Sequence, residues 1–174
     1  MGVILEVLGT STGQIIKLVA KGTFEGNLEG TPPILLVIFI GYEGHRVAAI
    51  INKYEPNSIV AVEAWPPYYA GWEIPSRREN QFLLNSPNIT HIRIDSRDPI
   101  KVKKQLVDLI NARKLNFGSF YVAPLGTKLQ AVGIYEAIKE LPFIRLVYSL
   151  PKSYLAKYYS TGSGSIWEYI IHSS

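Results

Sequence analysis

A glycine, a hydroxyl and a basic side chain follow one another in the stretch YVAPLGTKLQAVG at 121 to 133. Gly126 allows the backbone to approach a ligand closely, and Thr127 can cap a helix together with Gln130. Lys128 adds a full positive charge, and free N–H groups at a helix start attract phosphate or carboxylate groups. The segment therefore predicts either an anion-binding loop or a simple capped turn from a strand into a helix.

A second candidate is GYEGHR at 41 to 46, which directly follows the most apolar run of the chain. Arg46 is a candidate ligand residue because a guanidinium can hold a phosphate with two hydrogen bonds. Tyr42 belongs to the same segment. His45 has a side chain that can act as an acid or base near neutral pH, with simple exposure as the alternative. Glu43 would favour a helix start through the helix dipole.

A third candidate is the hydroxyl- and glycine-rich stretch within PKSYLAKYYSTGSGSIW, at 151 to 167. Ser160, Thr161 and Gly162 could wrap a phosphate or a sugar. Tyr158 offers a ring on which a base could stack. The alternative is a loop that only leads into a last strand.

Short β-branched runs alternate with helical patterns from residue 34 onward, and this alternation must position the candidates. Strands are expected at 34 to 40, 58 to 64, 90 to 95, 117 to 123, 143 to 150 and, last, 165 to 171. Helices are expected at 43 to 54, 76 to 84, 98 to 113 and 128 to 140, with Ser76 to Glu79 as a capping box and Asp98 before Pro99 as a helix start.

Strands that are separated by helices of this length need crossover connections, which are right-handed in parallel sheets. The sequence therefore predicts an α/β chain: a three-layer α/β/α Rossmann-like domain with a mainly parallel sheet. The polar alternation of 90 to 95 predicts a strand at an edge of the sheet or in a half-covered position. Ligands of open α/β sheets bind outside the carboxyl ends of the strands, which is where the three candidate segments fall.

The whole chain, 1 to 174, is expected to form one domain with a βα core at 34 to 150. Residues 1 to 33 are expected to form a β-hairpin and a loop, in which the flanks VILEVL and QIIKLVA surround GTSTG. A glycine-rich strand-to-helix loop is the alternative for GTSTG. Residues 151 to 174 are expected to form a loop and a strand.

Composition narrows the function. Of the 174 residues, 47% are hydrophobic and 18% are charged, which indicates a packed domain. The chain has no cysteine, which excludes disulfides, thiolate catalysis and cysteine-based metal sites. The net charge of +4 favours anionic partners, but the scattered basic residues argue against duplex nucleic acid. No membrane span or basic leader is evident, so we expect a cytoplasmic protein. Separately, no cofactor is predicted.

Catalytic motifs are weak. Asp95 and Asp98 could hold magnesium together with Glu63, but Asp98 is already explained as a helix cap, so no metal site is predicted. No Gly-x-Ser-x-Gly elbow follows a strand. The segment GTSTG lacks the lysine and the spacing of a Walker A loop. We therefore assign no catalytic residue.

The strand that ends in Gly126, Thr127 and Lys128 and runs into a helix resembles the ligand-sensing motif of CARF domains, the CRISPR-associated Rossmann-fold sensors of cyclic oligoadenylates. The resemblance covers the βα alternation from about 34 to 150, although Leu125 stands where that family often has a second glycine. It implies a homodimeric sensor of a nucleotide, a cyclic oligonucleotide or another phosphorylated small molecule in prokaryotic antiviral defence. Such sensors often carry a nuclease domain, for which the few residues after Tyr148 leave no room. The resemblance therefore implies a stand-alone sensor, which could act through a separate effector protein, or an unrelated member of a defence system.

Two alternatives to a sensor remain open. One is an enzyme of the same shape, such as a metal-independent phosphodiesterase that cleaves a cyclic signal as a ring nuclease. There Lys128 would stabilise developing negative charge while a hydroxyl or His45 assisted attack. The other alternative is a subunit of a defence complex that binds a protein partner through its aromatic loops.

Overall fold

The computed structural model describes residues 10–11, 15–21, 30–151, 154–155 and 168 of the chain. In the described part, strands and helices alternate from residue 34 onward. The strands are β1 (Thr10–Ser11), β2 (Ile15–Lys21), β3 (Ile34–Phe39), β4 (Ser58–Ala64), β5 (Thr90–Ile94), β6 (Ser119–Pro124), β7 (Ile144–Pro151) and β8 (Tyr154–Leu155). The helices are α1 (Gly44–Tyr54), α2 (Glu73–Glu79), α3 (Gln81–Leu84), α4 (Pro99–Asn111) and α5 (Lys128–Glu140).

One six-stranded sheet organises the described residues, with the strand order β2-β7-β6-β3-β4-β5. The five strands from β7 to β5 are parallel, and β2 pairs with β7 in the antiparallel sense. The strand order reverses between β3 and β6, which creates a switch point at their carboxyl ends. β5 lies at an edge of this sheet, as its polar alternation predicted.

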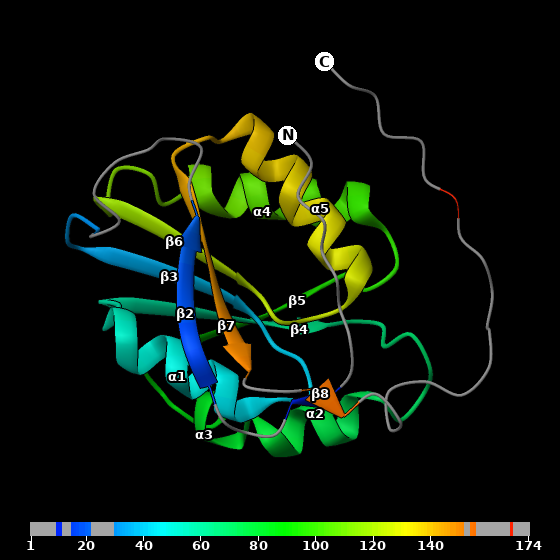
Figure 1. Ribbon diagram of the computed structural model, residues 1–174. Helices are drawn as coiled ribbons and strands as arrows, with labels where there is room; N and C mark the ends of the chain where they lie inside the picture. Colours follow the sequence, from blue (N-terminus) through cyan, green and yellow to red (C-terminus); the bar gives the residue numbers. More distant parts are fainter. Residues whose placement is uncertain (1–9, 12–14, 22–29, 152–153, 156–167, 169–174) are drawn as a thin grey trace.

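Helices cover both faces of the sheet (Figure 1). On one face, α4 and α5 bury Val102, Leu106 and Ile134 against β3, β4 and β6. On the other face, α1 and α3 bury Ile50 and Leu83 against the same strands. Every residue of β3 is buried, because this central strand is covered on both sides, as its continuous apolar run requires. The predicted three-layer Rossmann-like fold with a mainly parallel sheet is confirmed.

The prediction for residues 76 to 84 is wrong in two respects. The helix begins at Glu73 rather than at Ser76, and a break at Asn80 divides the segment into α2 and α3. Ser76 is not a cap, because its hydroxyl donates a hydrogen bond to the carbonyl of Gly41 at 3.0 Å. The Ser76 hydroxyl therefore bonds to a distant segment instead of to the backbone of its own helix, which the capping-box pattern had predicted.

The N-terminal region differs from the predicted hairpin where it can be compared. Thr10 and Ser11, expected in the turn, form β1 and pair with Tyr154 and Leu155 of β8. The second flank does form a strand, β2, but its partner in the sheet is β7. The first flank, at 3 to 8, and the last expected strand, at 165 to 171, fall outside the described residues apart from residue 168. Within the described residues, no helix is long and apolar enough to span a membrane.

Candidate functional site

The start of α5 is fixed by the capping box that the sequence predicted. The Thr127 hydroxyl accepts a hydrogen bond from the Gln130 amide at 3.2 Å, and the Gln130 side chain accepts one from the Thr127 amide at 3.0 Å. Thr127 also donates to the carbonyl of Ser96 at 3.1 Å. Gln130 is fully buried and donates to the carbonyl of Ile94 at 3.4 Å. These bonds hold the start of α5 against the end of β5.

Lys128 is the first residue of α5, and its side chain is exposed. No carboxylate of the described residues forms an ion pair with it. The amides of Lys128 and Leu129 likewise meet no hydrogen-bond acceptor within the described part of the chain. An exposed ammonium and two free N–H groups at the positive end of a helix dipole form a surface that favours an anion.

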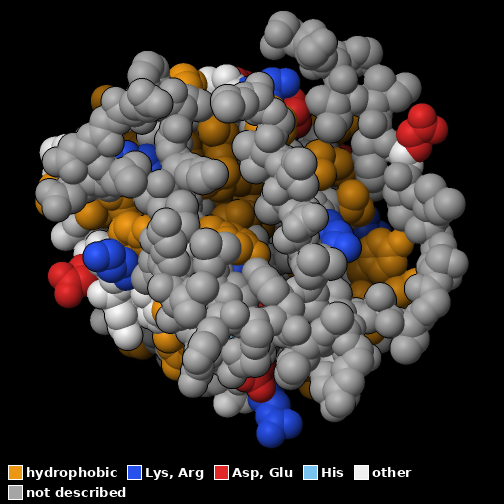
Figure 2. Space-filling view, in the orientation of Figure 1, with side chains coloured by type: hydrophobic (Ala, Val, Ile, Leu, Met, Phe, Trp, Pro, Cys, Tyr) orange, Lys and Arg blue, Asp and Glu red, His pale blue; other side chains and the backbone are white. Residues whose placement is uncertain are grey.

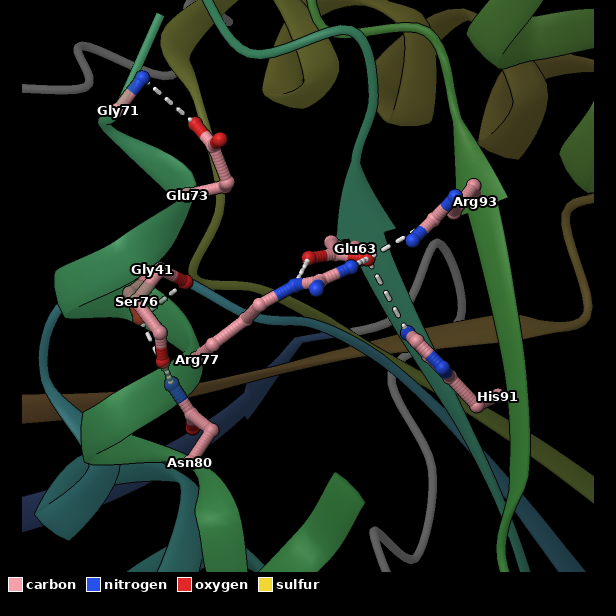
Figure 3. Close-up of polar contacts among 9 residues, drawn as sticks. All are labelled: Gly41, Glu63, Gly71, Glu73, Ser76, Arg77, Asn80, His91 and Arg93. Carbon is pink, nitrogen blue, oxygen red and sulfur yellow. Dashed lines mark hydrogen bonds and ion pairs between the residues drawn. The ribbon is translucent and has the colours of Figure 1, made fainter. Parts of the chain in front are cut away.

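Backbone atoms fill the switch point between β3 and β6. Gly41 follows β3, and a Cβ atom added to it would overlap the carbonyl oxygen of Leu125, which follows β6. The Gly41 carbonyl accepts hydrogen bonds from the Ser76 hydroxyl and from the Asn80 side chain, the latter at 2.8 Å (Figure 3). A ligand at this edge of the sheet must therefore lie outside these backbone contacts.

Arg46 lies on α1 and is 6% exposed. Its guanidinium donates to the Glu43 carboxylate at 2.7 Å, to the Ser149 hydroxyl at 2.9 Å and to the Ser149 carbonyl at 2.9 Å. It also lies over the Tyr148 ring, 4.5 Å from the centroid. Burial acts to lower the pKa of Arg46, but the bonds to Glu43 and Tyr148 outweigh it and raise that pKa.

The predicted ligand residues fall into separate groups. Gly126, Thr127 and Lys128 lie together at the start of α5, whereas Arg46 is on α1, which covers the opposite face of the sheet (Figure 1). Tyr42, between β3 and α1, is half-exposed, and partial burial and the charge of Glu73 raise its pKa. The other predicted ligand residues, Tyr158, Ser160, Thr161 and Gly162, lie outside the described residues.

A cluster that the sequence did not predict surrounds Glu63, a buried residue of β4 (Figure 3). Both carboxylate oxygens accept hydrogen bonds from Arg77 of α2, one of them from Nη2 at 2.8 Å. Arg93 of β5 donates to the carboxylate from Nε at 3.0 Å, and Nε2 of His91 lies 3.5 Å from it. We call Glu63, Arg77, His91 and Arg93 the Glu63 cluster. It ties α2 to the edge of the sheet.

The charges of the cluster explain how a carboxylate is stable inside a strand. Hydrogen bonds from Arg77 and, to a smaller extent, from Arg93 hold the pKa of Glu63 below its ordinary value, although burial acts in the opposite direction. The pKa of Arg77 is raised by the same bond. The sequence held a signal for this cluster: Glu63 is the only charge in its strand, and His91 and Arg93 alternate on one side of the next.

Fold and site together define a Rossmann-like α/β/α domain with cationic groups near the carboxyl ends of its parallel strands. No family model and no curated protein sequence matches the chain. Among solved structures, the chain is similar to Can2 from Sulfobacillus thermosulfidooxidans in complex with cyclic tetra-adenylate. The two are 12% identical, the similarity covers 62% of this chain and 29% of that chain, and the TM-score is 0.46. This likeness concerns the fold alone.

Proposed function

We propose that this chain binds a phosphorylated ligand of the nucleotide type at the start of α5. The observation that carries the proposal is the exposed ammonium of Lys128 beside the free amides of Lys128 and Leu129, on a helix start that Thr127 and Gln130 hold in place. A phosphate gains most from such a site because its negative charge meets both the helix dipole and fixed N–H donors.

The finer form of the proposal is a homodimeric sensor in prokaryotic antiviral defence that responds to a cyclic oligonucleotide through a separate effector protein. Its support is the resemblance of Gly126, Thr127 and Lys128 to the CARF ligand-sensing motif, at the end of a parallel strand. Tyr42 and the stretch at 158 to 162 would then contribute to the ligand site. Arg46 would hold α1 against β7 on the other face of the sheet, through its bonds to Ser149.

A thermal-shift screen of the purified chain against AMP, ATP, cyclic di-AMP and cyclic tetra- and hexa-adenylate tests the proposal. A ligand at about 100 times its dissociation constant stabilises the folded state by about 2.7 kcal/mol, which is readily measured. We expect a shift that Lys128→Ala removes. The matched control is Lys104→Ala, which deletes an exposed lysine of α4 and should leave the shift unchanged.

The screen also separates the alternatives. No shift with any nucleotide would overturn the proposal and favour a protein-binding role. A shift that survives Lys128→Ala would remove that residue from the site. Cleavage of a cyclic nucleotide in the presence of EDTA would identify a metal-independent phosphodiesterase rather than a sensor.

A further inference from the structure

The Glu63 cluster has more positive charge than its structural role requires. One carboxylate faces two guanidinium groups, which leaves a net charge of +1 even when His91 is neutral. A buried glutamate is already well compensated by the two hydrogen bonds from Arg77. Arg93 therefore brings a second full charge to a site where one would neutralise the carboxylate.

Each guanidinium also retains donors that face away from Glu63. Arg77 uses Nε and Nη2, and Arg93 uses Nε, to bind the carboxylate. Nη1 of Arg77 and both Nη atoms of Arg93 have no acceptor among the described residues. The Arg77 and Arg93 side chains are 41% and 47% exposed, so these donors are accessible to a ligand.

The two arginines are held in place before any ligand arrives. The Glu63 carboxylate binds both side chains, and Figure 3 shows them reaching it from α2 and β5. The Arg93 guanidinium also lies 4.3 Å from the centroid of the Trp65 ring. Such preorganisation reduces the entropy that the side chains lose on binding, so more of the interaction energy appears as affinity.

Trp65 gives the cluster a second kind of contact. It follows β4 directly, and its side chain is 39% exposed beside Arg93. An exposed indole next to guanidinium donors matches a nucleotide, whose phosphate pairs with arginine and whose base stacks on an aromatic ring. The Arg93 guanidinium already covers one face of the indole, so a base would stack on the other face.

We propose that Arg77 and Arg93 bind the phosphate of a nucleotide, either free or within a single strand, and that the base stacks on Trp65. This second site is carried by α2, β4 and β5, and it does not depend on the site proposed at the start of α5. It lies on the face of the sheet that α2 covers, whereas α5 covers the other face.

Binding of fluorescein-labelled oligo(dA) and oligo(rA), each ten nucleotides long, tests the second site. Fluorescence anisotropy at low salt measures their affinity. We expect Arg93→Gln and Arg77→Gln each to weaken binding about tenfold, the effect of losing a hydrogen bond to a charged group. Trp65→Leu should weaken it by a similar factor. The matched control is Arg78→Gln, which removes an exposed arginine from the same helix and should change binding less than about twofold.

Competition identifies the source of the phosphate. Displacement of the labelled strand by AMP would indicate a free nucleotide, and strand binding that resists AMP would indicate a single strand. Displacement by inorganic phosphate as effective as that by AMP would overturn the role of Trp65. If neither oligonucleotide nor AMP binds, or if Arg78→Gln weakens binding as much as Arg93→Gln, the second site is wrong.

Removing an arginine leaves Glu63 less well compensated, so the variants need a check that does not depend on their folding. In the unmodified protein, the Nε–Hε resonances of Arg77 and Arg93 should move when AMP or oligo(dA) is added, and that of Arg78 should not. The reverse pattern would overturn the proposal. The arginine substitutions are therefore repeated in the Lys128→Ala background, where the site proposed at the start of α5 is already removed. Weaker oligonucleotide binding there reports on the second site alone, and no further weakening would overturn it.

Discussion

Arg46 and the Glu63 cluster use the same chemistry in opposite ways. Around Arg46, one guanidinium is buried, and a carboxylate, a hydroxyl and a carbonyl occupy its donors. Around Glu63, the carboxylate is buried instead, and the two guanidinium groups that bind it are nearly half-exposed. The guanidinium of Arg46 is therefore committed to partners within the protein. The two arginines around Glu63 still have N–H donors that another molecule could bind.

An arginine near the carboxyl ends of the strands in an α/β fold is therefore not by itself a ligand residue. Burial of a guanidinium requires that its donors be matched internally, and the matching removes them from any ligand. Burial of the carboxylate has the opposite result, because it orients cations whose outer donors stay free. Four substitutions test this contrast, beginning with the one expected to have the largest effect.

Arg46→Met should lower the free energy of unfolding by about 3 kcal/mol, because it removes a buried guanidinium together with its bonds to Glu43 and Ser149. Urea denaturation measures the loss. Arg78→Met, on the exposed side of α2, is the control and should cost less than about 0.5 kcal/mol. Equal costs for the two variants would show that Arg46 is not a closed structural site.

Gly41→Ala should lower the free energy of unfolding by about 2 kcal/mol, since the added methyl group overlaps the Leu125 carbonyl and can be relieved only by moving backbone. Thermal and urea denaturation report the change. Tyr42→Ala, one position later in the loop, removes a half-exposed side chain and should have a smaller effect. A neutral Gly41→Ala would show that the switch point is open enough to admit a ligand.

Glu63→Gln should cost about 1 kcal/mol at neutral pH, because the charged part of the hydrogen bonds to Arg77 and Arg93 is lost. The folded pKa of Glu63 lies below its ordinary value of 4.5, so the unfolded chain takes up the proton first as the pH falls. The stabilisation from the carboxylate is therefore present above pH 4.5 and is lost as the pH drops through the folded pKa.

The difference in stability between the unmodified chain and Glu63→Gln should accordingly narrow when urea denaturation is repeated from pH 7 down to pH 3. The same series on His91→Gln controls for protonation of the histidine beside the carboxylate. If the difference in the free energy of unfolding between the two proteins stays constant or grows on acidification, the pKa of Glu63 is not depressed.

Lys128→Ala should change the free energy of unfolding by less than about 0.5 kcal/mol, because the side chain is exposed and pairs with no carboxylate among the described residues. Urea denaturation without ligand measures this. A larger loss would mean that Lys128 supports the fold. Any effect of this variant on nucleotide binding would then have a structural explanation.

Sequence patterns that depend on neighbours along the chain were read correctly. The continuous apolar run of β3 predicted a strand that is covered on both faces. The pair Thr127 and Gln130 predicted a capping box, and Asp98 predicted the start of α4, where its side chain accepts hydrogen bonds from two amides of the first turn. All of these interactions span three residues or fewer, or repeat with the period of one element.

Contacts between distant segments were not predictable in the same way. Arg46 reaches Ser149, 103 positions away, so no local pattern could show that its donors are occupied. Ser76 was misread because its hydroxyl bonds to Gly41, 35 positions earlier. The Glu63 cluster depends on the pairing of β4 with β5 and on the approach of α2, and each is set by tertiary packing.

The pairing of β4 with β5 places Glu63 opposite Arg93, and Val62 opposite Ile92. Because side chains alternate across a strand, a slip of β5 by one residue would turn Arg93 toward the apolar layer under α4 and expose Ile92 and Ile94 on the polar side. The single carboxylate in β4 thus favours one register of β5 over the others. It makes misalignment of the edge strand costly during folding, whether or not a nucleotide ever binds there.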